Sequence, residues 1–171
     1  MAVKPPIIRS ISWPAVLLQL GLVGGLAFGL AKLLPLFDRT LDPALAFFCA
    51  ALVHLIFYRV MRNVLSRDFR RGFKRLRRGE YAEAAGDFET SIRHFGERPW
   101  LDRYRWILLG GASTMSYREM SLCNAAFCHS QTGNGARAIE LYEQTVREFP
   151  HSRLANTALN LIRSVQRSAA S

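Results

Sequence analysis

Residues 79–92 read GEYAEAAGDFETSI and residues 133–146 read GNGARAIELYEQTV, so one pattern occurs twice at an offset of 54 residues. Each copy has a glycine, then a small alanine, then an aromatic residue: Gly79, Ala84 and Phe88 in the first copy, and Gly133, Ala138 and Tyr142 in the second. A glycine suits the turn between two helices, a small residue lets two helices cross closely, and an aromatic side chain fills the space beside the crossing. The sequence therefore predicts a repeated helix–turn–helix unit in an all-α protein.

The pattern extends into the helices that precede the two turns. In the second copy Leu122 and Ala126 supply a large and a small residue before the turn, and Pro150 ends the unit; in the first copy Gly72 is the small residue. Over residues 66–168 this arrangement resembles the tetratricopeptide repeat (TPR) family. The resemblance implies pairs of antiparallel helices stacked side by side.

The resemblance also implies how the second part of the chain is divided. The helical domain is expected to cover residues 62–168, with repeat one at about 66–98, an insertion at 99–118, repeat two at about 119–152 and a capping helix at 153–168. The capping helix is expected to cover the last repeat with one apolar face: Leu154, Ala158, Leu161, Ile162 and Val165. The tail QRSAAS, residues 166–171, is expected to be disordered.

Two apolar segments precede the repeats. Residues 13–37 and residues 44–61 each contain a single charged side chain. About 20 apolar residues in a helix cross the ~30 Å hydrocarbon core of a membrane. Joined by the short connector 38–43, the two segments predict an antiparallel transmembrane hairpin after a polar N-terminal segment, residues 1–12. A cleaved signal peptide is the alternative, but its apolar region is shorter than this run.

The first apolar segment has glycines at every fourth position, Gly21, Gly25 and Gly29. Small residues on one face let membrane helices approach closely. The expected partner of this glycine face is either the second segment, through Ala46 and Ala50, or a second copy of the protein.

The net positive charge of the chain comes entirely from its first part. Residues 1–78 hold 13 Lys and Arg against 3 Asp and Glu, whereas residues 79–171 hold 10 of each. Nine of the basic residues lie from Arg59 to Arg78, of which Arg59 is in the last turn of the second apolar segment and the other eight follow it. The positive-inside rule places this cluster, the repeats and the N-terminus in the cytoplasm. A prokaryotic inner membrane is the expected location.

Within the basic cluster, residues 63–78 have an apolar residue every three or four positions: Leu65, Phe69, Phe73 and Leu76. This spacing predicts a basic amphipathic helix. The helix can serve as the first helix of repeat one, and its basic face can also contact anionic lipid headgroups. Nucleic-acid binding is not expected, since no aromatic stacking platform or recognition motif accompanies the charges.

The insertion at 99–118 departs from the repeat pattern. It predicts a short helix from Trp100 to Leu109, followed by a Gly-Gly turn. Ser116 and Glu119 then form a capping box, which predicts the start of a new helix. The insertion can lengthen the repeat core, cover a groove of the repeats, or place its tryptophans at a membrane interface.

No constellation of catalytic or metal-binding residues is evident. The four histidines lack metal-ligand spacing, Cys123 and Cys128 do not form a C-x-x-C pair, and phosphate-binding and nucleophile motifs are missing. The three cysteines fit reduced thiols in helix cores. The chain is therefore expected to be neither an enzyme nor a holder of a cofactor or metal.

The resemblance implies that the first helix of each repeat lines a binding groove. The residues at those positions are Phe69, Phe73 and Arg77 in repeat one, and Asn124, Phe127 and Gln131 in repeat two. Asn124 matches a residue that holds a peptide carboxylate in some family members, but the other clamp residues have no convincing counterparts here.

The expected function is a membrane-tethered scaffold or adaptor that binds a protein or peptide partner through this groove. The alternative is a self-associating structural or accessory subunit of a membrane complex, in which the glycine face forms a homo-oligomer.

Overall fold

The computed structural model describes residues 13–37, 42–109 and 113–170, and the elements in these ranges are all helices. The all-α prediction is therefore confirmed for this part of the chain. The predicted N-terminal segment 1–12 and most of the connector 38–43 lie outside the described residues. Two compact units are present, which we call the α1–α2 unit (described residues 13–37, 42–66, 103–109 and 113–114) and the helix stack (residues 67–102 and 115–170).

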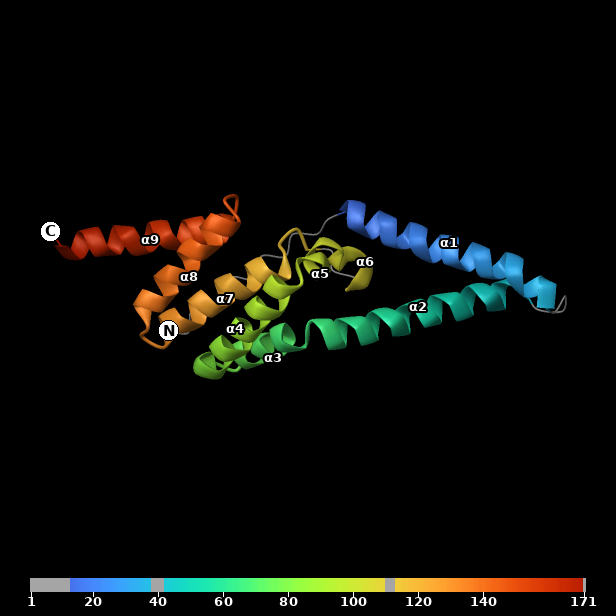
Figure 1. The fold of residues 1–171 in the computed structure, drawn as a ribbon, viewed down its shortest axis with the longest axis horizontal. Coiled ribbons are helices and arrows are strands. Elements are labelled where there is room, and N and C mark those ends of the chain that lie inside the picture. Colours follow the sequence, from blue (N-terminus) through green and yellow to red (C-terminus); the bar gives the residue numbers. More distant parts are fainter. Residues whose placement is uncertain (1–12, 38–41, 110–112, 171) are drawn as a thin grey trace. The chain divides into compact units, whose positions relative to one another are not determined.

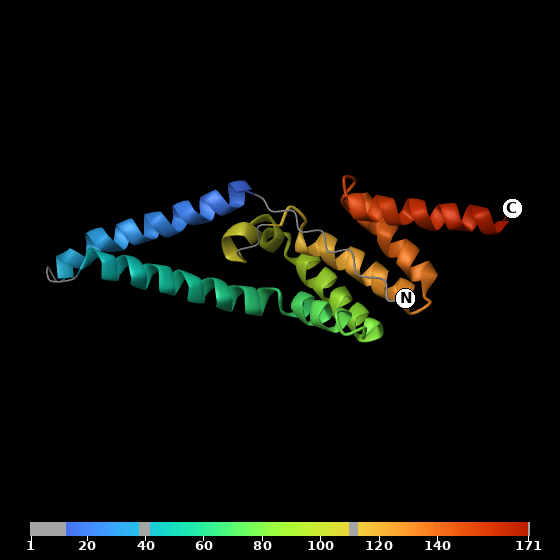
Figure 2. The same cartoon turned by 180° about the vertical axis from the view of Figure 1, so that it is seen from behind.

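In the α1–α2 unit, two long helices pack against each other. Helix α1 covers Trp13–Phe37 and α2 covers Pro43–Leu65, and they lie side by side in both ribbon views (Figures 1 and 2). The side chain of Asp42 caps α2 by accepting a hydrogen bond from the Ala44 amide at 2.9 Å. Helix α2 thus continues four residues beyond the predicted segment 44–61.

Only part of this unit meets a length-and-hydropathy test for membrane spans. Within the described ranges, the helix Phe47–Leu65 is long and apolar enough to cross a membrane, while the apolar stretch Val16–Leu30 of α1 is shorter. The sequence predicted a hairpin of two spans, but the test identifies one candidate span among the described residues. Most large apolar side chains of α2 are exposed, among them Phe48, Leu55 and Val64.

The helix stack contains two helix–turn–helix pairs followed by a final helix. The first pair is α3 (Arg67–Leu76) with α4 (Tyr81–Glu97), the second is α7 (Tyr117–Gln131) with α8 (Gly135–Glu148), and α9 covers Arg153–Ala170. Helix α7 packs on α4 and on α8, and α9 packs on α8. The order of packing is therefore α3, α4, α7, α8, α9, the order in which they occur in the chain (Figure 1).

Both turns use their glycine in the left-handed conformation. The backbone angle φ is 79° at Gly79 and 80° at Gly133, a region that residues with a Cβ adopt at a cost of about 1–2 kcal/mol. The repeated glycine is therefore required by the backbone, and the predicted helix–turn–helix pairs are confirmed.

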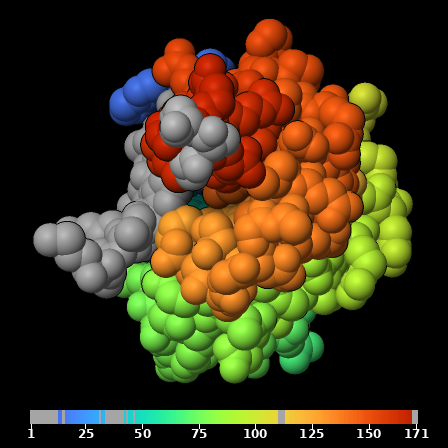
Figure 3. Space-filling model, turned by 90° about the vertical axis from the view of Figure 1, so that its left-hand side faces the viewer, coloured from blue at the N-terminus to red at the C-terminus, as the bar shows by residue number. Residues whose placement is uncertain are grey.

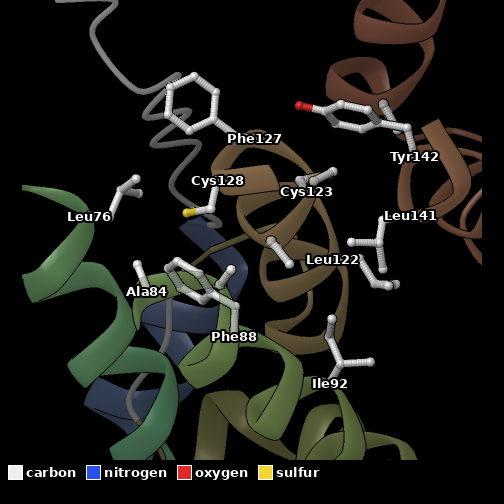
Figure 4. Packing of buried hydrophobic residues seen from close by; sticks show 14 of the residues in the cluster. Leu76, Ala84, Phe88, Ile92, Leu122, Cys123, Phe127, Cys128, Leu141 and Tyr142 are labelled. Atoms are coloured by element: carbon white, nitrogen blue, oxygen red, sulfur yellow. The ribbon is translucent and has the colours of Figure 1, made fainter. Parts of the chain in front are cut away.

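The repeated small and aromatic residues form the core of the stack. Ala84 and Phe88 are fully buried in α4, and Ala138 and Tyr142 are buried in α8. A Cβ added to Gly72 would lie 3.1 Å from the Asp87 Cβ and 3.2 Å from the Phe88 ring, so α3 crosses α4 closely at this point. Figure 4 shows the side chains that fill the space between the helices, all of them members of one buried cluster: Leu76, Ala84, Phe88, Ile92, Leu122, Cys123, Phe127, Cys128, Leu141 and Tyr142.

The insertion forms two short helices where one was predicted. Helix α5 covers Pro99–Arg103 and α6 covers Arg105–Leu108, with the break at Tyr104. Asp102 accepts hydrogen bonds from the amides of Tyr117 (2.6 Å) and Arg118 (2.9 Å), so its carboxylate satisfies the first turn of α7. The predicted Ser116 cap is confirmed, because its side chain accepts from the Glu119 amide at 3.0 Å.

The end of the insertion belongs to the α1–α2 unit. Helix α6 contacts both α1 and α2, and the Gln19 side chain donates to the Trp106 carbonyl at 2.7 Å. Leu109 is almost fully buried there. The predicted Gly-Gly turn lies outside the described residues. The insertion therefore serves both units: Asp102 caps a helix of the stack, while α6 packs on the two long helices.

Helix α9 covers the last pair with only part of its apolar face. Of the predicted face, Leu154, Ala158 and Ile162 pack on the buried cluster of the stack, whereas Leu161 and Val165 are 65% and 61% exposed. Ala155 and Leu159, which were not predicted, are buried in the same cluster. The surface of α9 lies against that of α8 in the space-filling view (Figure 3). The predicted five-residue face is thus only partly used for packing, and the helix runs on to Ala170 where a disordered tail was expected.

Candidate functional site

A hollow of about 450 Å³ lies along α3. Its lining consists of two aromatic and four basic side chains: Phe69, Arg70, Phe73, Lys74, Arg77 and Arg78. The volume lies in the range of sites that bind small ligands or side chains of a partner. Three of the predicted groove residues, Phe69, Phe73 and Arg77, come together in this hollow. We call it the α3 hollow.

The two phenylalanines form an aromatic floor that the stack holds in place. The rings of Phe69 and Phe73 are nearly parallel, 18° apart in orientation, with centroids 6.4 Å apart. Phe69 also meets Phe88 of α4 edge to face at 5.8 Å and Tyr117 of α7 at 5.1 Å. Such aromatic pairs stabilise by about 0.5–1.5 kcal/mol beyond the area they bury. Phe69 is therefore anchored in the stack, and Phe73 extends the apolar surface along α3.

A buried carboxylate separates the basic residues of α3 into two groups. Asp87 of α4 is 4% exposed, and its two oxygens accept hydrogen bonds from Arg71 at 2.6 Å and Arg75 at 2.8 Å. The hydrogen bond with Asp87 is the main cause that raises the pKa of Arg71. These two arginines neutralise a charge inside the stack, while the basic side chains of the α3 hollow lie on a different face of the helix.

The sequence-based prediction did not identify Asp87. The signal was present, since an offset of 54 residues aligns Asp87 with Leu141 in the second copy. An acidic residue at a position that is apolar in the other copy indicates a buried ion pair, because a lone buried carboxylate is costly.

The predicted groove residues of α7 do not line the α3 hollow. Phe127 is 8% exposed and its ring meets Tyr81 at 6.1 Å, so this side chain belongs to the core. The Asn124 side-chain amide donates to the Met120 carbonyl of its own helix at 2.8 Å. Gln131 is exposed at the end of α7. Only the α3 half of the predicted groove therefore forms a concave surface with the expected residues.

The glycine face of α1 points away from the other described atoms. A Cβ added at Gly21, Gly25 or Gly29 would meet nothing within 4 Å in the part of the chain that the structure describes. Among the described side chains of the two long helices, Ala27 and Ala50 are the buried ones. The described side chains of the second segment therefore leave the glycine face open.

Two ionic contacts join the helix pairs of the stack. Arg118 donates to the Glu148 carboxylate at 2.6 Å and 2.8 Å and to the Ile92 carbonyl, so one side chain links α4, α7 and α8. This hydrogen bond is the main reason that the pKa of Glu148 is lowered. The Glu89 carboxylate of α4 similarly lies 3.2 Å from the His129 ring nitrogen of α7 and accepts a hydrogen bond from Arg137 of α8, also at 3.2 Å.

The two thiols of α7 are buried and are expected to have low reactivity. Cys123 and Cys128 are buried in the stack, and burial raises the pKa of each to about 12. Cys49 of α2 is exposed. In the described ranges, no group of three or more His, Cys, Asp or Glu side chains is placed to hold a metal ion.

Comparisons with known proteins give no further guide: no family model, no curated protein sequence and no solved structure matches this chain. Its function must therefore be inferred from its own residues.

Proposed function

We propose that the chain is a membrane-tethered protein-interaction module, a scaffold or adaptor built on a TPR-like helix stack. The α3 hollow is the observation that carries the proposal, because it combines an aromatic floor with a basic rim along the first helix of the stack. Partner helices and peptides dock in grooves by burying apolar side chains, and charged rims select among them.

The TPR resemblance supports this proposal. In the two helix pairs, the turn glycine, the small residue and the aromatic residue fill equivalent places in the stack. Stacked helix pairs of this kind present extended surfaces to other proteins. The family assignment itself remains part of the proposal.

The membrane anchor is also part of the proposal. Helix Phe47–Leu65 supplies one candidate span, and the antiparallel packing of α1 on α2 supports a second. The nine basic residues between Arg59 and Arg78 favour a cytoplasmic position for the stack under the positive-inside rule, as in a prokaryotic inner membrane.

Site-specific photo-crosslinking in cells tests the interaction module. A photo-reactive residue replaces Phe73 in the full-length chain, and a matched chain carries it at Arg153, an exposed position at the start of α9. We expect one defined protein adduct from position 73 that is absent from position 153. The adduct should weaken when Lys74→Glu is added. The same adducts at both positions, or none at either, would contradict the proposal.

A second candidate function is self-association through the glycine face. The observation in its favour is the open space around Gly21, Gly25 and Gly29 in the described structure. Small residues at fourfold spacing on an uncovered helix face suit close packing with a second membrane helix. Replacing all three glycines by leucine should convert an oligomer to a monomer in detergent, as measured by light scattering. An unchanged mass would remove this candidate.

A further inference from the structure

We propose that the segment recognised by the α3 hollow is an acidic amphipathic helix of the partner protein. The inference rests on the proposed function, since it specifies the chemistry of the partner at the same surface. It follows from the charge of the hollow, from the spacing of its side chains and from the position of α3 in the stack.

Among the described residues that line the hollow, the charged ones are all basic: Arg70, Lys74, Arg77 and Arg78. Arg78 has a long contact of 3.8 Å with Glu80. Asp87, the buried acid next to α3, is already engaged by Arg71 and Arg75. Across the described ranges, the structure records no ion pair for Lys74 or Arg77, and both are exposed. Carboxylates of a partner would therefore meet positive charge that the stack does not compensate.

The spacing of the charges matches a helix. Arg70, Lys74 and Arg77 follow one another at four and three residues, so they form a stripe along α3 next to the stripe of Phe69 and Phe73. A second helix with acidic residues at the same spacing and apolar residues on the adjoining positions is complementary in both charge and apolar contact.

The position of α3 also favours a helix as occupant. Helix α7 has a neighbour in the stack on each side, α4 and α8, whereas α3 packs mainly on α4. Helix α3 is therefore the first helix of the stack, and its side chains Phe69 and Phe73 pack against the core cluster on one side while they stay partly exposed on the other. A docked helix would add the next layer, as the repeats of a helical stack do for one another.

The chain itself does not offer the complementary helix. Its N-terminal residues 1–12 contain Lys4 and Arg9 and no acid. The exposed acids of α8 are already paired within the chain: Glu140 with Arg137 at 2.7 Å, Glu143 with Arg163 at 3.5 Å, and Glu148 with Arg118 at 2.6 Å. On α4, Asp87, Glu89 and Glu97 are likewise paired, which leaves Glu83 as a single exposed acid without a recorded ion pair on that helix. Docking of α8 or α4 from a second copy would exchange existing pairs for new ones, which favours a different protein as the occupant.

The test measures binding of a defined probe to the full-length chain in lipid discs of neutral charge. The probe is a fluorescent amphipathic peptide of about 18 residues, long enough to form a helix on binding, with leucines on one face and glutamates beside them. A twin peptide carries lysine at every glutamate position. We expect the acidic peptide to bind at least about tenfold more tightly than its twin, because like charges across an interface are strongly unfavourable.

Two charge-matched variants locate the binding surface. Lys74→Glu with Arg77→Glu should weaken binding of the acidic peptide by at least about tenfold. Arg147→Glu with Arg153→Glu makes the same change of charge on α8 and α9, away from the α3 hollow, and should change the affinity by less than about twofold. Equal affinities for the wild type and the α3 variant, or equal binding of the two peptides, would overturn the inference.

Two further results separate the inference from its alternatives. If the acidic peptide fails to bind in neutral discs, while anionic vesicles bind the wild type and not the Lys74→Glu, Arg77→Glu variant, the basic rim is assigned to lipid headgroups and the acidic-helix proposal is overturned. The adduct from position 73 identifies the partner segment directly by mass spectrometry. A neutral or basic segment would refute the acidic helix and leave the interaction module intact, whereas the lack of any adduct would refute the interaction module itself.

Discussion

The two helix pairs of the stack follow the same pattern, yet equivalent residues have different surroundings. At the offset of 54 residues Phe73 of α3 corresponds to Phe127 of α7. Phe73 lines an open hollow, whereas Phe127 is 8% exposed and packs on Tyr81. Helix α7 lies between α4 and α8, while α3 begins the stack. The layer in which a repeat lies therefore decides whether the same side chain contributes to the core or to a surface.

The polar residues differ between the two pairs as well. In the first pair, Asp87 lies between Arg71 and Arg75. In the second pair, Leu141 is the residue equivalent to Asp87, and Ala125 is the residue equivalent to Arg71. Both arrangements fill the crossing of two helices. The first one additionally fixes two arginines on the inner side of α3, which leaves the outer side to the basic rim of the hollow.

The largest expected effect is the difference in stability loss between alanine variants of the two equivalent phenylalanines. Phe127→Ala should lower the free energy of unfolding of the stack by about 3–5 kcal/mol, because it leaves a cavity in the core. Phe73→Ala should cost about 1 kcal/mol, since its side chain is partly exposed already. Amide hydrogen exchange on the full-length chain in detergent measures both values. Equal losses would mean that α3 and α7 are equally enclosed.

The next effect concerns the buried carboxylate. Asp87→Asn should destabilise the stack by about 2 kcal/mol, less than for a fully buried pair, because Arg71 and Arg75 are 44% and 36% exposed. Copying the second pair with Arg71→Ala and Asp87→Leu should recover stability to within about 1 kcal/mol of the wild type. The same exchange experiment on α3 and α4 amides compares the two. A double variant less stable than Asp87→Asn would show that the pairs are not interchangeable.

The turn glycines should respond alike, since both have φ near 80°. Gly79→Ala and Gly133→Ala should each cost about 1 kcal/mol through backbone strain. Open space around both positions removes steric clash as a cause. Exchange rates of the amides that follow each turn report the effect. Clearly unequal losses would indicate that one turn is held by contacts that the other lacks.

The smallest effect is the pH dependence of the contact between Arg118 and Glu148. The folded state lowers the pKa of Glu148, so its contribution is present above the ordinary carboxyl pKa and is lost as the pH falls through the lowered folded value. Glu148→Gln should cost no more than about 1 kcal/mol at pH 7, because the pair is partly exposed. The difference from the wild type should shrink when exchange is measured near pH 3. A difference that stays constant would exclude this ionic origin.

Features that depend on a few neighbouring residues were predictable from the sequence. Features that depend on which helices pack on both sides of a given helix were not. The turn glycines and the Ser116 cap follow from rules that involve a few neighbouring residues, and both are confirmed. The burial of Phe127 depends on which helices flank α7, and the sequence around it gives no sign of that. The hollow depends on Phe73 and on the position of α3 as the first of the described helices of the stack.

Two helix breaks were also missed for a physical reason. The sequence predicted one basic helix from residue 63 to 78, but α2 ends at Leu65 and α3 begins at Arg67. The Ser66 hydroxyl donates to the Arg62 carbonyl at 2.7 Å, a contact that often bends helices. A similar break at Tyr104 divides the insertion between the two units. Neither site has the glycine or proline that usually signals a break.

The burial of two thiols gives the native chain a built-in chemical reporter. Cys123 and Cys128 are buried in the stack and burial raises the pKa of each to about 12, so we expect maleimide reagents to leave them unmodified while the stack is folded. Cys49 then accounts for any fast labelling. If α2 lies in a bilayer, lipid shields Cys49 and the untreated protein resists a water-soluble maleimide altogether. If α2 faces water, one label per chain is incorporated, without a single engineered substitution.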